Sequence, residues 1–382
     1  MKLPQGFQAA GVTAGLKASG KPDLGVLLSP APLAWAYMST ENLLKAACVT
    51  RNRGCYENDR LVHGVVVNSG NANCATGEQG DKDNEMFATL SAASLNLESA
   101  QNLLTASTGV VGKPLPVEVI KSALPKLGSE LSDSADDFAR AVMTTDLVPK
   151  QTEHPLPGGA KIVGVAKGSG MIHPNMATML AFVMTDAVVS QADLRERWPD
   201  IVRRSFNQVT VDGDTSPNDM AFVFSSGRVE APQGELFAGL ERVAISLTKM
   251  IARDGEGATK LLTVRVTGAR SDEEARLAAR AVARSPLVKS AVHGNDPNWG
   301  RILTALGYSG ADADISGVHI SLQGVSVYRG QPLEFDATSL SAAMKAEDVL
   351  LEADLGVGTG SGEAYGCDLS AEYIRINADY TT

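Results

Sequence analysis

The sequence has few cysteines, no long apolar run and no excess of positive charge. Its four cysteines are scattered without C-x-x-C spacing, so we expect reduced thiols rather than a zinc site or a disulfide framework. The formal net charge of −10 argues against nucleic acid or an anionic membrane as a partner. The most apolar early run, residues 24–38, is interrupted by Pro30 and Pro32 and is too short to span a bilayer. The first residues show no apolar segment of a signal peptide, so we expect a cytoplasmic protein.

Two segments look like ligand loops but lack residues that such loops need. The Gly-rich run at residues 356–363 is not followed by the helix and acidic residue of a dinucleotide site. The acidic run at residues 209–219 has no bidentate Glu where a calcium loop requires one. We therefore expect no metal and no nucleotide cofactor, and interpret residues 209–219 as a rigid loop at a pocket edge.

The order of apolar patterns predicts an α/β protein of layered, mixed sheets and helices. With 382 residues the chain can bury roughly three quarters of its unfolded surface. Short apolar runs alternate with segments of helical periodicity, separated by Gly-rich turns. Strands are expected at residues 24–29, 61–67, 158–165, 179–184, 262–267, 287–292, 318–328 and 349–355, and from residue 373 onward. Helices are expected at residues 85–104, 116–124, 135–143, 191–207, 235–252, 298–306 and 340–346, and after Ser271; residues 43–49 fit either.

One stretch, residues 167–186, joins the two halves of the chain. Its first part contains Gly168, Ser169 and Gly170, which favour turns and unusual backbone angles. Its second part is a short apolar run that reads as a buried strand. Thr178 thus stands where an irregular loop enters a strand. Such a threonine is most often only a strand-opening residue, but here Lys167 lies upstream.

The sequence of residues 166–180 resembles the signature of the ornithine acetyltransferases, the glutamate N-acetyltransferases of arginine biosynthesis. Further blocks of resemblance run from Gly6 to Thr382 in the right order, and residues 35–58 depart most from the family. The resemblance implies a layered fold like that of the N-terminal-nucleophile hydrolases. It also implies self-cleavage between Ala177 and Thr178, which gives chains 1–177 and 178–382 that stay associated, two of each.

The same resemblance assigns the site residues. Thr178 matches the nucleophile, and Thr108 and Gly109 match the pair that holds the negative oxygen. On its own, a Thr-Gly pair of this kind would be read as a plain turn. The matching substrate contacts are Thr144, Thr145, Lys167, Thr178, Glu256, Asn377 and Thr382.

The loop at residues 68–77 also matches the family, either as a wall of the active site or as a loop satisfied by its own Asn side chains. Glu256 lies between two glycines and is either a ligand contact or an exposed acid in a turn. The roles of His293, Asp212 and Asp214 stay open; a structural role is favoured over a base for His293.

The chemistry explains why a free N-terminal threonine would suffice. A threonine hydroxyl needs a base to become a nucleophile. The α-amine released by cleavage has a pKa of about 7.7–8.0 and can be that base, so no separate triad is required. The family implies ping-pong transfer of acetyl from N-acetylornithine to glutamate. Whether acetyl-CoA is a second acetyl donor is left open.

Three alternatives remain at this point. An N-terminal-nucleophile amidohydrolase or aminopeptidase would release its acyl group into water rather than pass it to glutamate. A binding protein would stay uncleaved. Ser169 could be the nucleophile instead of Thr178, although it lacks the flanking pattern of a nucleophile elbow.

Overall fold

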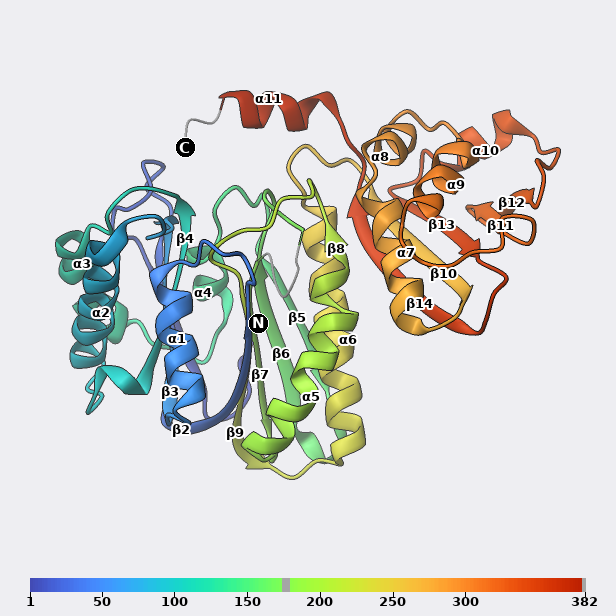
Figure 1. Ribbon diagram of the computed structural model, residues 1–382. Helices are drawn as coiled ribbons and strands as arrows, with labels where there is room; N and C mark the ends of the chain where they lie inside the picture. The colour runs from blue at the N-terminus through green and yellow to red at the C-terminus, as the bar shows by residue number, and fades with distance from the viewer. Residues whose placement is uncertain (174–178, 380–382) are drawn as a thin grey trace.

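Two mixed β-sheets organise the fold in the computed structural model, which describes residues 1–173 and 179–379 (Figure 1). The larger sheet has the order β4-β3-β2-β9-β7-β6-β5, and β1 pairs with β2 beside this path. Strands β3 and β4 are parallel, as are β7 and β9, whereas β6 and β7 are antiparallel. The strands are β1 (Gln8–Val12), β2 (Leu24–Ser39), β3 (Val62–Asn71), β4 (Leu103–Val110), β5 (Lys150–Pro155), β6 (Lys161–Lys167), β7 (Leu180–Ala187) and β9 (Met220–Val229).

The long strand β2 changes partners along its length. Its first half pairs with β1 and β3, and its second half, from Ala34, pairs with β9. The register with β3 shifts between Leu28 and Leu33, where Pro30 and Pro32 lie. Proline has no N–H to donate to a ladder, so it is tolerated where the pairing changes. The strand predicted at residues 24–29 is therefore confirmed but continues beyond the prolines.

Helices cover the larger sheet. Figure 1 shows α5 (Gln191–Arg204) and α6 (Gln233–Arg253) in front of the strands β5, β6, β7 and β9. The helix predicted at residues 235–252 is confirmed as α6, and its apolar stripe is buried against this face, in the order Leu236, Leu240, Val243, Leu247 and Ile251. A second core contains residues of α1 (Ala47–Glu57) and α4 (Asp136–Ala141), and α2 (Gly77–Ser94) and α3 (Val117–Ser129) pack against each other.

Strand β7 is buried on both faces. Ala181 and Val183 belong to the core beneath α5 and α6, and Leu180, Phe182 and Met184 belong to the core on the other side. A strand covered on both faces has no polar alternation, which explains the continuous apolar run in the sequence. The buried strand predicted at residues 179–184 is confirmed.

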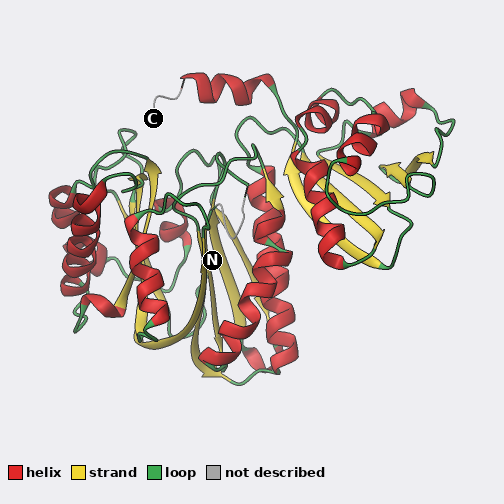
Figure 2. Ribbon diagram, in the orientation of Figure 1, coloured by secondary structure: helices red, strands yellow, loops and turns green. Residues whose placement is uncertain are grey.

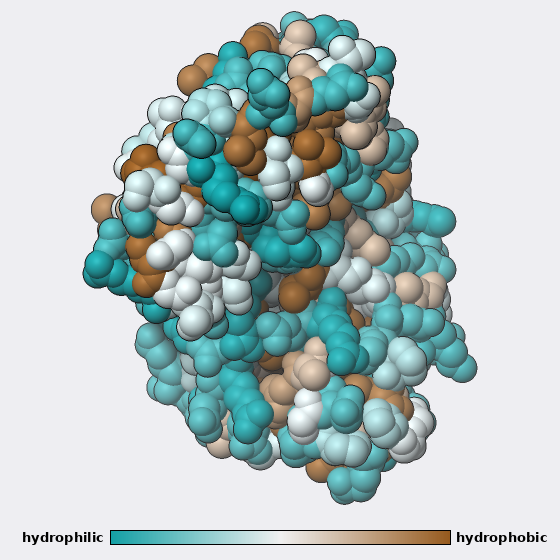
Figure 3. All heavy atoms as spheres, turned by 90° about the vertical axis from the view of Figure 1, so that its right-hand side faces the viewer, coloured by the Kyte–Doolittle hydropathy of each residue, from teal (hydrophilic) through white to brown (hydrophobic). Residues whose placement is uncertain are grey.

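A second sheet, formed by β8 and by strands that follow α6, organises a smaller unit (Figure 2). Its sheet has the order β12-β11-β13-β10-β14-β8. The strands are β8 (Val209–Thr210), β10 (Leu261–Ala269), β11 (His319–Leu322), β12 (Val325–Arg329), β13 (Asp348–Asp354) and β14 (Gly360–Cys367). The helices are α7 (Asp272–Arg284), α8 (Pro286–His293), α9 (Trp299–Gly307) and α10 (Ala337–Ala343). On the face seen in Figure 3, apolar side chains form separate groups among hydrophilic ones.

The C-terminal helix α11 (Ala371–Asp379) leaves the smaller unit and runs back towards the larger one (Figure 1). The sequence predicted a strand here, and that prediction was wrong. Ile374 is 65% exposed and no residue of this segment is buried, so its alternating apolar residues do not face a core. The i, i+3 ion pair of Glu372 with Arg375 suits a helix surface.

The strand predicted at residues 287–292 is also wrong, because this segment is the helix α8. Ser285 accepts a hydrogen bond from the Val288 N–H as an N-cap, and Pro286 occupies the first turn. The buried residues Val288, Ala291 and Val292 lie at helical spacing. The β-branched residues of this segment suggested a strand, but the N-cap and the helical spacing of the buried residues favour a helix.

Further boundaries differ from the sequence prediction. The first half of residues 68–77 continues β3, and an additional strand, β5, precedes the strand predicted at residues 158–165. Helix α2 begins and ends earlier than residues 85–104, so that Met86 is half exposed and Phe87 is buried. The undecided segment at residues 43–49 leads into α1. The mixed α/β class itself is confirmed.

Candidate active site

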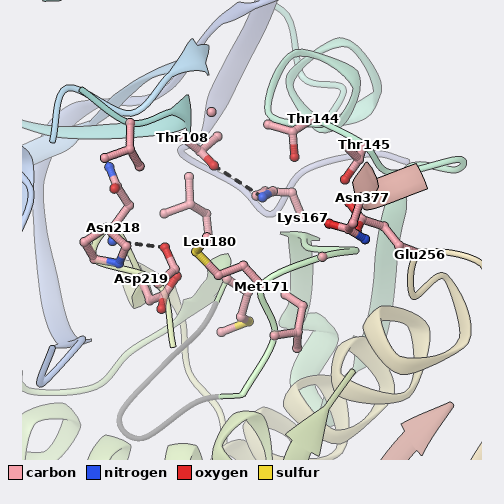
Figure 4. A pocket seen from close by; sticks show the side chains of 17 residues that line it. Thr108, Thr144, Thr145, Lys167, Met171, Leu180, Asn218, Asp219, Glu256 and Asn377 are labelled. Carbon is pink, nitrogen blue, oxygen red and sulfur yellow. Dashed lines mark hydrogen bonds between the residues drawn. The ribbon is translucent and has the colours of Figure 1, made fainter. Parts of the chain in front are cut away.

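A pocket lies at one end of the larger sheet, where β4 and β6 end and β7 and β9 begin. Residues of the loops at 144–145, 168–172, 216–219 and 254–260 line it together with helix α11 (Figure 4). All of the described residues that the family resemblance assigned to the site line this one pocket: Thr108, Gly109, Thr144, Thr145, Lys167, Glu256 and Asn377.

The remaining predicted positions lie outside the described residues. These are Ala177 and Thr178 of the expected cleavage site and Thr382 at the C-terminus. The residues that follow Thr178 in the chain, Met179 and Leu180, line the pocket. Leu180 pairs with Lys167 across the ladder of β6 and β7.

Thr108 and Lys167 are in contact within the pocket. The Lys167 Nζ donates to Thr108 Oγ1 at 3.3 Å, and both side chains are buried (Figure 4). Burial lowers the pKa of Lys167, an effect that the carboxylates of Asp146 and Asp219 oppose. Because the ammonium occupies a lone pair of the Thr108 oxygen, the hydroxyl proton of Thr108 is directed to another acceptor.

Gly109 adopts a backbone conformation that favours glycine. Its φ is +132°, and a Cβ at this position would lie 2.3 Å from the carbonyl carbon of Gly70 on the neighbouring strand. Gly109 pairs with Gly70, and the register of β3 and β4 becomes irregular at Asn71. Strand β4 can therefore bring its Thr108–Gly109 end into close contact with β3 only because position 109 has no side chain.

A buried ion cluster supports the wall that carries Thr144 and Thr145. The Lys150 Nζ lies 2.6 Å from Asp146 Oδ1 and 2.5 Å from Asp254 Oδ2, and all three side chains are buried. Asp146 also accepts hydrogen bonds from the N–H groups of Thr144 and Gly168.

Burial alone would raise the pKa of Asp146. The charges of Lys150 and Lys167 and the hydrogen bonds outweigh burial and hold this pKa well below its usual range. Asp146 is therefore an anion that fixes the loop after α4 to the start of the Gly168–Gly170 turn.

Glu256 reaches the pocket from the loop between α6 and β10. Its Oε2 accepts a hydrogen bond from Asn377 Nδ2 of α11 at 2.9 Å, and its N–H donates to the Ser169 carbonyl at 3.1 Å. A Cβ at Gly170 would lie 2.3 Å from the Glu256 carboxyl carbon. The glycine at position 170 thus leaves room for this carboxylate.

The comparisons with known proteins identify the family. The model described as the ArgJ family matches residues 8–382. The chain belongs to the ArgJ family. It is 56% identical to the arginine biosynthesis bifunctional protein ArgJ of Thermus thermophilus, with 100% of both chains covered. It is 53% identical to the protein of that name from Deinococcus radiodurans, with 100% of this chain and 98% of the relative covered. The family predicted from residues 166–180 is confirmed.

A crystal structure of the arginine biosynthesis bifunctional protein ArgJ from Bacillus halodurans also matches this ArgJ-family chain. The two are 41% identical, with a TM-score of 0.51. The match covers 52% of this chain and 98% of the solved chain. The solved chain is therefore about half as long as the one described here.

Ser169, the alternative nucleophile, does not line the pocket of this ArgJ-family chain. Its side chain is buried, and its Oγ donates to the Asp254 carbonyl at 2.7 Å. This hydrogen bond joins the Gly168–Gly170 turn to the end of α6. The geometry favours a structural role for Ser169.

The three residues whose roles the sequence left open lie outside the pocket lining. Asp212 accepts hydrogen bonds from the N–H groups of Met171 and Ile172, and the Asp214 N–H also donates to Asp212. The acidic loop thereby holds the turn before the expected cleavage site. Farther along, residues 216–219 line the pocket, in agreement with the interpretation as a pocket-edge loop.

His293 contacts a buried carboxylate. Its Nδ1 lies 2.7 Å from Asp368 Oδ2, and Asp368 also accepts from the N–H groups of Thr259 and Lys260. The hydrogen bonds from Thr259 and His293 outweigh burial and lower the pKa of Asp368. His293 and Asp368 thus support the base of the loop that carries Glu256.

The asparagines at residues 68–73 bond to nearby backbone. Asn68 Nδ2 donates to the Asn71 carbonyl, and Asn71 Nδ2 donates to the Lys113 and Pro114 carbonyls. None of these asparagines lines the active-site pocket, but Gly70 and Asn71 line a second pocket that shares Gly109, Thr144 and Thr145 with it. The asparagines hold β3 and the end of β4 in place.

The sequence pattern did not single out the ion cluster, nor Asn218 and Asp219 within the predicted pocket-edge loop. Asn218 Nδ2 donates to the carbonyls of Ala72 and Ser107, and the neighbouring Asp219 lines the pocket. Asp146 follows the two predicted threonines directly, and that spacing was the available signal. Lys150 and Asp254 gave no local signal because they are 104 residues apart in the chain.

Two features of residues 1–173 and 179–379 bear on other functions. Neither segment contains a helix that is long and apolar enough to cross a membrane. Nor do these residues include a group of three or more His, Cys, Asp or Glu side chains arranged to hold a metal ion.

Proposed function

We propose that this chain transfers an acetyl group from N2-acetylornithine to glutamate in arginine biosynthesis, through an acetyl-Thr178 intermediate. The observation that carries the proposal is geometric. Seven residues that the family resemblance assigned, spread from Thr108 to Asn377, line one pocket, and the chain continues from Thr178 into its wall. Relatives across the full length are named for arginine biosynthesis.

The first half-reaction makes the acyl-enzyme. The α-amine of Thr178 accepts the proton of its own hydroxyl, and the oxygen attacks the acetyl carbonyl. The Thr108 hydroxyl and the Gly109 N–H donate to the negative oxygen of the tetrahedral intermediate. Lys167 supports this role, because its contact with Thr108 Oγ1 leaves the hydroxyl proton free to donate. The C–N bond then breaks, the protonated amine gives its proton to the leaving nitrogen, and ornithine departs.

The second half-reaction reverses these steps with another amine. The α-amino group of glutamate attacks the ester carbonyl of acetyl-Thr178 and loses a proton. The ester C–O bond breaks, Thr178 regains its proton, and N-acetylglutamate leaves. Water would divert this intermediate to acetate, so exclusion of water from the pocket is part of the mechanism.

Two charged groups of the pocket, Lys167 and Glu256, suit the two ends of ornithine. Lys167 pairs with the substrate α-carboxylate. Glu256, positioned by Asn377, pairs with the side-chain ammonium. Thr144, Thr145 and Thr382 complete the substrate contacts.

Self-cleavage between Ala177 and Thr178 generates the catalytic α-amine. The sheet is suited to hold the products together, because β6 of residues 1–177 pairs along its length with β7 of residues 178–382. Strand β2 pairs in the same way with β9. The solved relative of about half this length has the size of one product. The assembly contains two copies of each product.

The name of the relatives supports a second activity. They are called bifunctional. The same acetyl-Thr178 could form from acetyl-CoA, since a thioester carbonyl is also open to attack by the threonine oxygen. The chain would then also make N-acetylglutamate from acetyl-CoA and glutamate.

Mass spectrometry of the purified protein tests the proposal. Incubation with N-acetylornithine alone should add one acetyl group to the fragment that begins at Thr178, and glutamate should remove it as N-acetylglutamate. Formation of acetate at a rate that glutamate does not change would instead indicate an amidohydrolase. The variant Thr178→Ala should neither be cleaved nor acetylated.

A further inference from the structure

A second pocket adjoins the active-site pocket and carries two lysines. It is lined by Lys17, Gly70, Asn71 and Lys113, and it shares Gly109, Thr144 and Thr145 with the active-site pocket. We call it the lysine pocket. Since Gly109 belongs to both, a molecule whose carbonyl lies at Thr108 and Gly109 can extend into the lysine pocket.

The turn that presents Lys17 is built around a buried carboxylate. The oxygens of Asp23 accept hydrogen bonds from the N–H groups of Ala14, Gly15, Leu16 and Lys17, at 2.6–3.1 Å. Asp23 is fully buried. Four donors on one carboxylate fix the backbone of this turn firmly.

The stem of Lys17 packs beside the oxyanion strands. A Cβ at Gly70 would lie 3.2 Å from Lys17 Cγ, and Gly70 pairs with Gly109 on the next strand. The Lys17 Nζ donates to the Pro22 carbonyl at 2.6 Å, which leaves its other two protons for a ligand. Lys17 thus lies one strand away from the site of acetyl transfer.

Lys113 approaches the same pocket from the other side. It follows β4, and its backbone carbonyl accepts a hydrogen bond from Asn71 Nδ2 at 3.2 Å. Among the residues that the structure describes, neither Lys113 nor Lys17 forms an ion pair with a carboxylate, and no acidic side chain lines the lysine pocket. The two ammonium groups are therefore not in direct contact with a carboxylate, although Asp23 and Asp146 act on Lys17 from outside the lining.

The proposed reaction needs such a region. Ornithine and glutamate share an α-amino acid core, but their side chains end in opposite charges. Glu256 would attract the ammonium of ornithine and repel the side-chain carboxylate of glutamate. Lys167 is buried against Thr108 and is already assigned to the α-carboxylate. A separate basic region is required for a substrate whose far end is an anion.

We infer that the lysine pocket receives the negatively charged end of a substrate whose reacting group lies at Thr108 and Gly109. This inference rests on the proposed acetyl transfer. Two molecules carry the required anion: glutamate, with its side-chain carboxylate, and acetyl-CoA, with its phosphates. The two ammonium groups bind an anion of this kind from either source, and they do not bind ornithine.

The test uses the full chain with Lys17→Gln, Lys113→Gln and the double substitution. Three reactions are measured: acetyl exchange between N-acetylornithine and labelled ornithine, transfer from N-acetylornithine to glutamate, and transfer from acetyl-CoA to glutamate. Lys17→Arg and Lys113→Arg keep the charge and should restore function. Lys82→Gln, an exposed lysine of α2 outside both pockets, is the matched control.

In the double variant we expect the KM for glutamate, for acetyl-CoA or for both to rise about tenfold or more, with ornithine exchange changed less than about twofold. A rise for glutamate alone identifies the side-chain carboxylate as the ligand, and a rise for acetyl-CoA alone identifies the phosphates.

Unchanged KM values for both anions would overturn the inference, as would an equal loss in all three reactions. Lys113 is exposed, so its substitution tests the inference even if a Lys17 variant fails to fold. Absence of ornithine exchange in the unsubstituted protein would instead refute the proposed function itself.

Discussion

The two ends of the active site carry opposite charges and are built in different ways. At one end, Glu256 reaches across the space left by Gly170 and is held by Asn377 of the C-terminal helix. At the other end, Lys17 and Lys113 line a pocket without an acidic side chain among the described residues. The difference indicates how one reacting centre can exchange a cationic amino acid for an anionic one: each substrate has a region of matching charge.

A substitution in the buried cluster of Asp146, Lys150 and Asp254 should have the largest effect, and it should lower the free energy of unfolding. Asp146→Asn removes one of the two carboxylates that neutralise Lys150 and weakens the contacts to the N–H groups of Thr144 and Gly168. Because Asp254 still pairs with the ammonium, the free energy of unfolding in urea should fall by about 1.5–3 kcal/mol, the contribution of a buried hydrogen bond to a charged group. Asp137→Asn breaks an exposed pair with Arg140 and should change it by less than about 1 kcal/mol. Equal effects of the two substitutions would contradict this description.

Removal of the Glu256 charge should weaken the binding of N-acetylornithine without weakening that of glutamate. Glu256→Gln should raise the KM for N-acetylornithine about 10- to 100-fold, because a charge-assisted hydrogen bond is lost. The KM for glutamate should not rise. Glu118→Gln on the exposed surface of α3 is the control for charge alone. Unchanged KM for N-acetylornithine in the Glu256 variant would place the ornithine ammonium elsewhere.

A smaller effect should follow when the same carboxylate is displaced but keeps its charge. A methyl group at Gly170 would meet the Glu256 carboxylate, whose flexible side chain can move away. Gly170→Ala should therefore raise the KM for N-acetylornithine roughly three- to tenfold with little change in the unfolding midpoint. Gly234→Ala, which adds a methyl group in open space, should change neither quantity. If the two variants behave alike, Gly170 does not position Glu256.

The basic end should respond to pH. Burial lowers the pKa of Lys17 to about 8, although Asp23 and Asp146 raise it; Lys167 and Lys21 add to the lowering. The lysine is therefore mainly charged at pH 7 and mainly neutral at pH 9, so anion binding should weaken across this range. In steady-state assays the KM for glutamate should rise a few-fold between these values in the unsubstituted protein.

An arginine at position 17 stays charged over the same range. The rise in the KM for glutamate should therefore be absent in Lys17→Arg. The α-amine of Thr178, with its usual pKa of about 7.7–8.0, loses a proton as well, but this favours the nucleophile and does not raise the KM. A KM that is independent of pH in the unsubstituted protein would exclude Lys17 from binding the anion.

Local patterns in the sequence predicted the elements whose burial is regular. The strand β7 and the helix α6 were predicted because their apolar residues lie within a core. The helix expected after Ser271 is α7, which Ser271 caps, and Ser190 caps α5 in the same way. Local rules of this kind fail for α8 and α11. The β-branched residues of α8 suggest a strand, but Ser285 caps a helix there. The alternating residues of α11 also suggest a strand, but none of them is buried in a core.

The prediction of the candidate site depended on the resemblance to a known family, because the local sequence pattern around each residue did not indicate a site. Thr108 and Glu256, taken alone, would be a turn residue and an exposed acid; their shared pocket exists only after β4 and the end of α6 are brought together. The Asp146–Lys150–Asp254 cluster could not be predicted, because ion pairs between distant segments leave no periodic signal. The position of Lys17 beside the site could not be predicted either, because it depends on the pairing of Gly70 with Gly109, and these residues belong to different strands.

N-terminal sequencing of the active protein tests the central claim most directly. The proposed mechanism requires a free α-amine on Thr178, so the account predicts two amino termini in equal amounts, one at Met1 and one at Thr178. A fully active preparation that yields only the Met1 terminus and a single 40.0 kDa chain would contradict it.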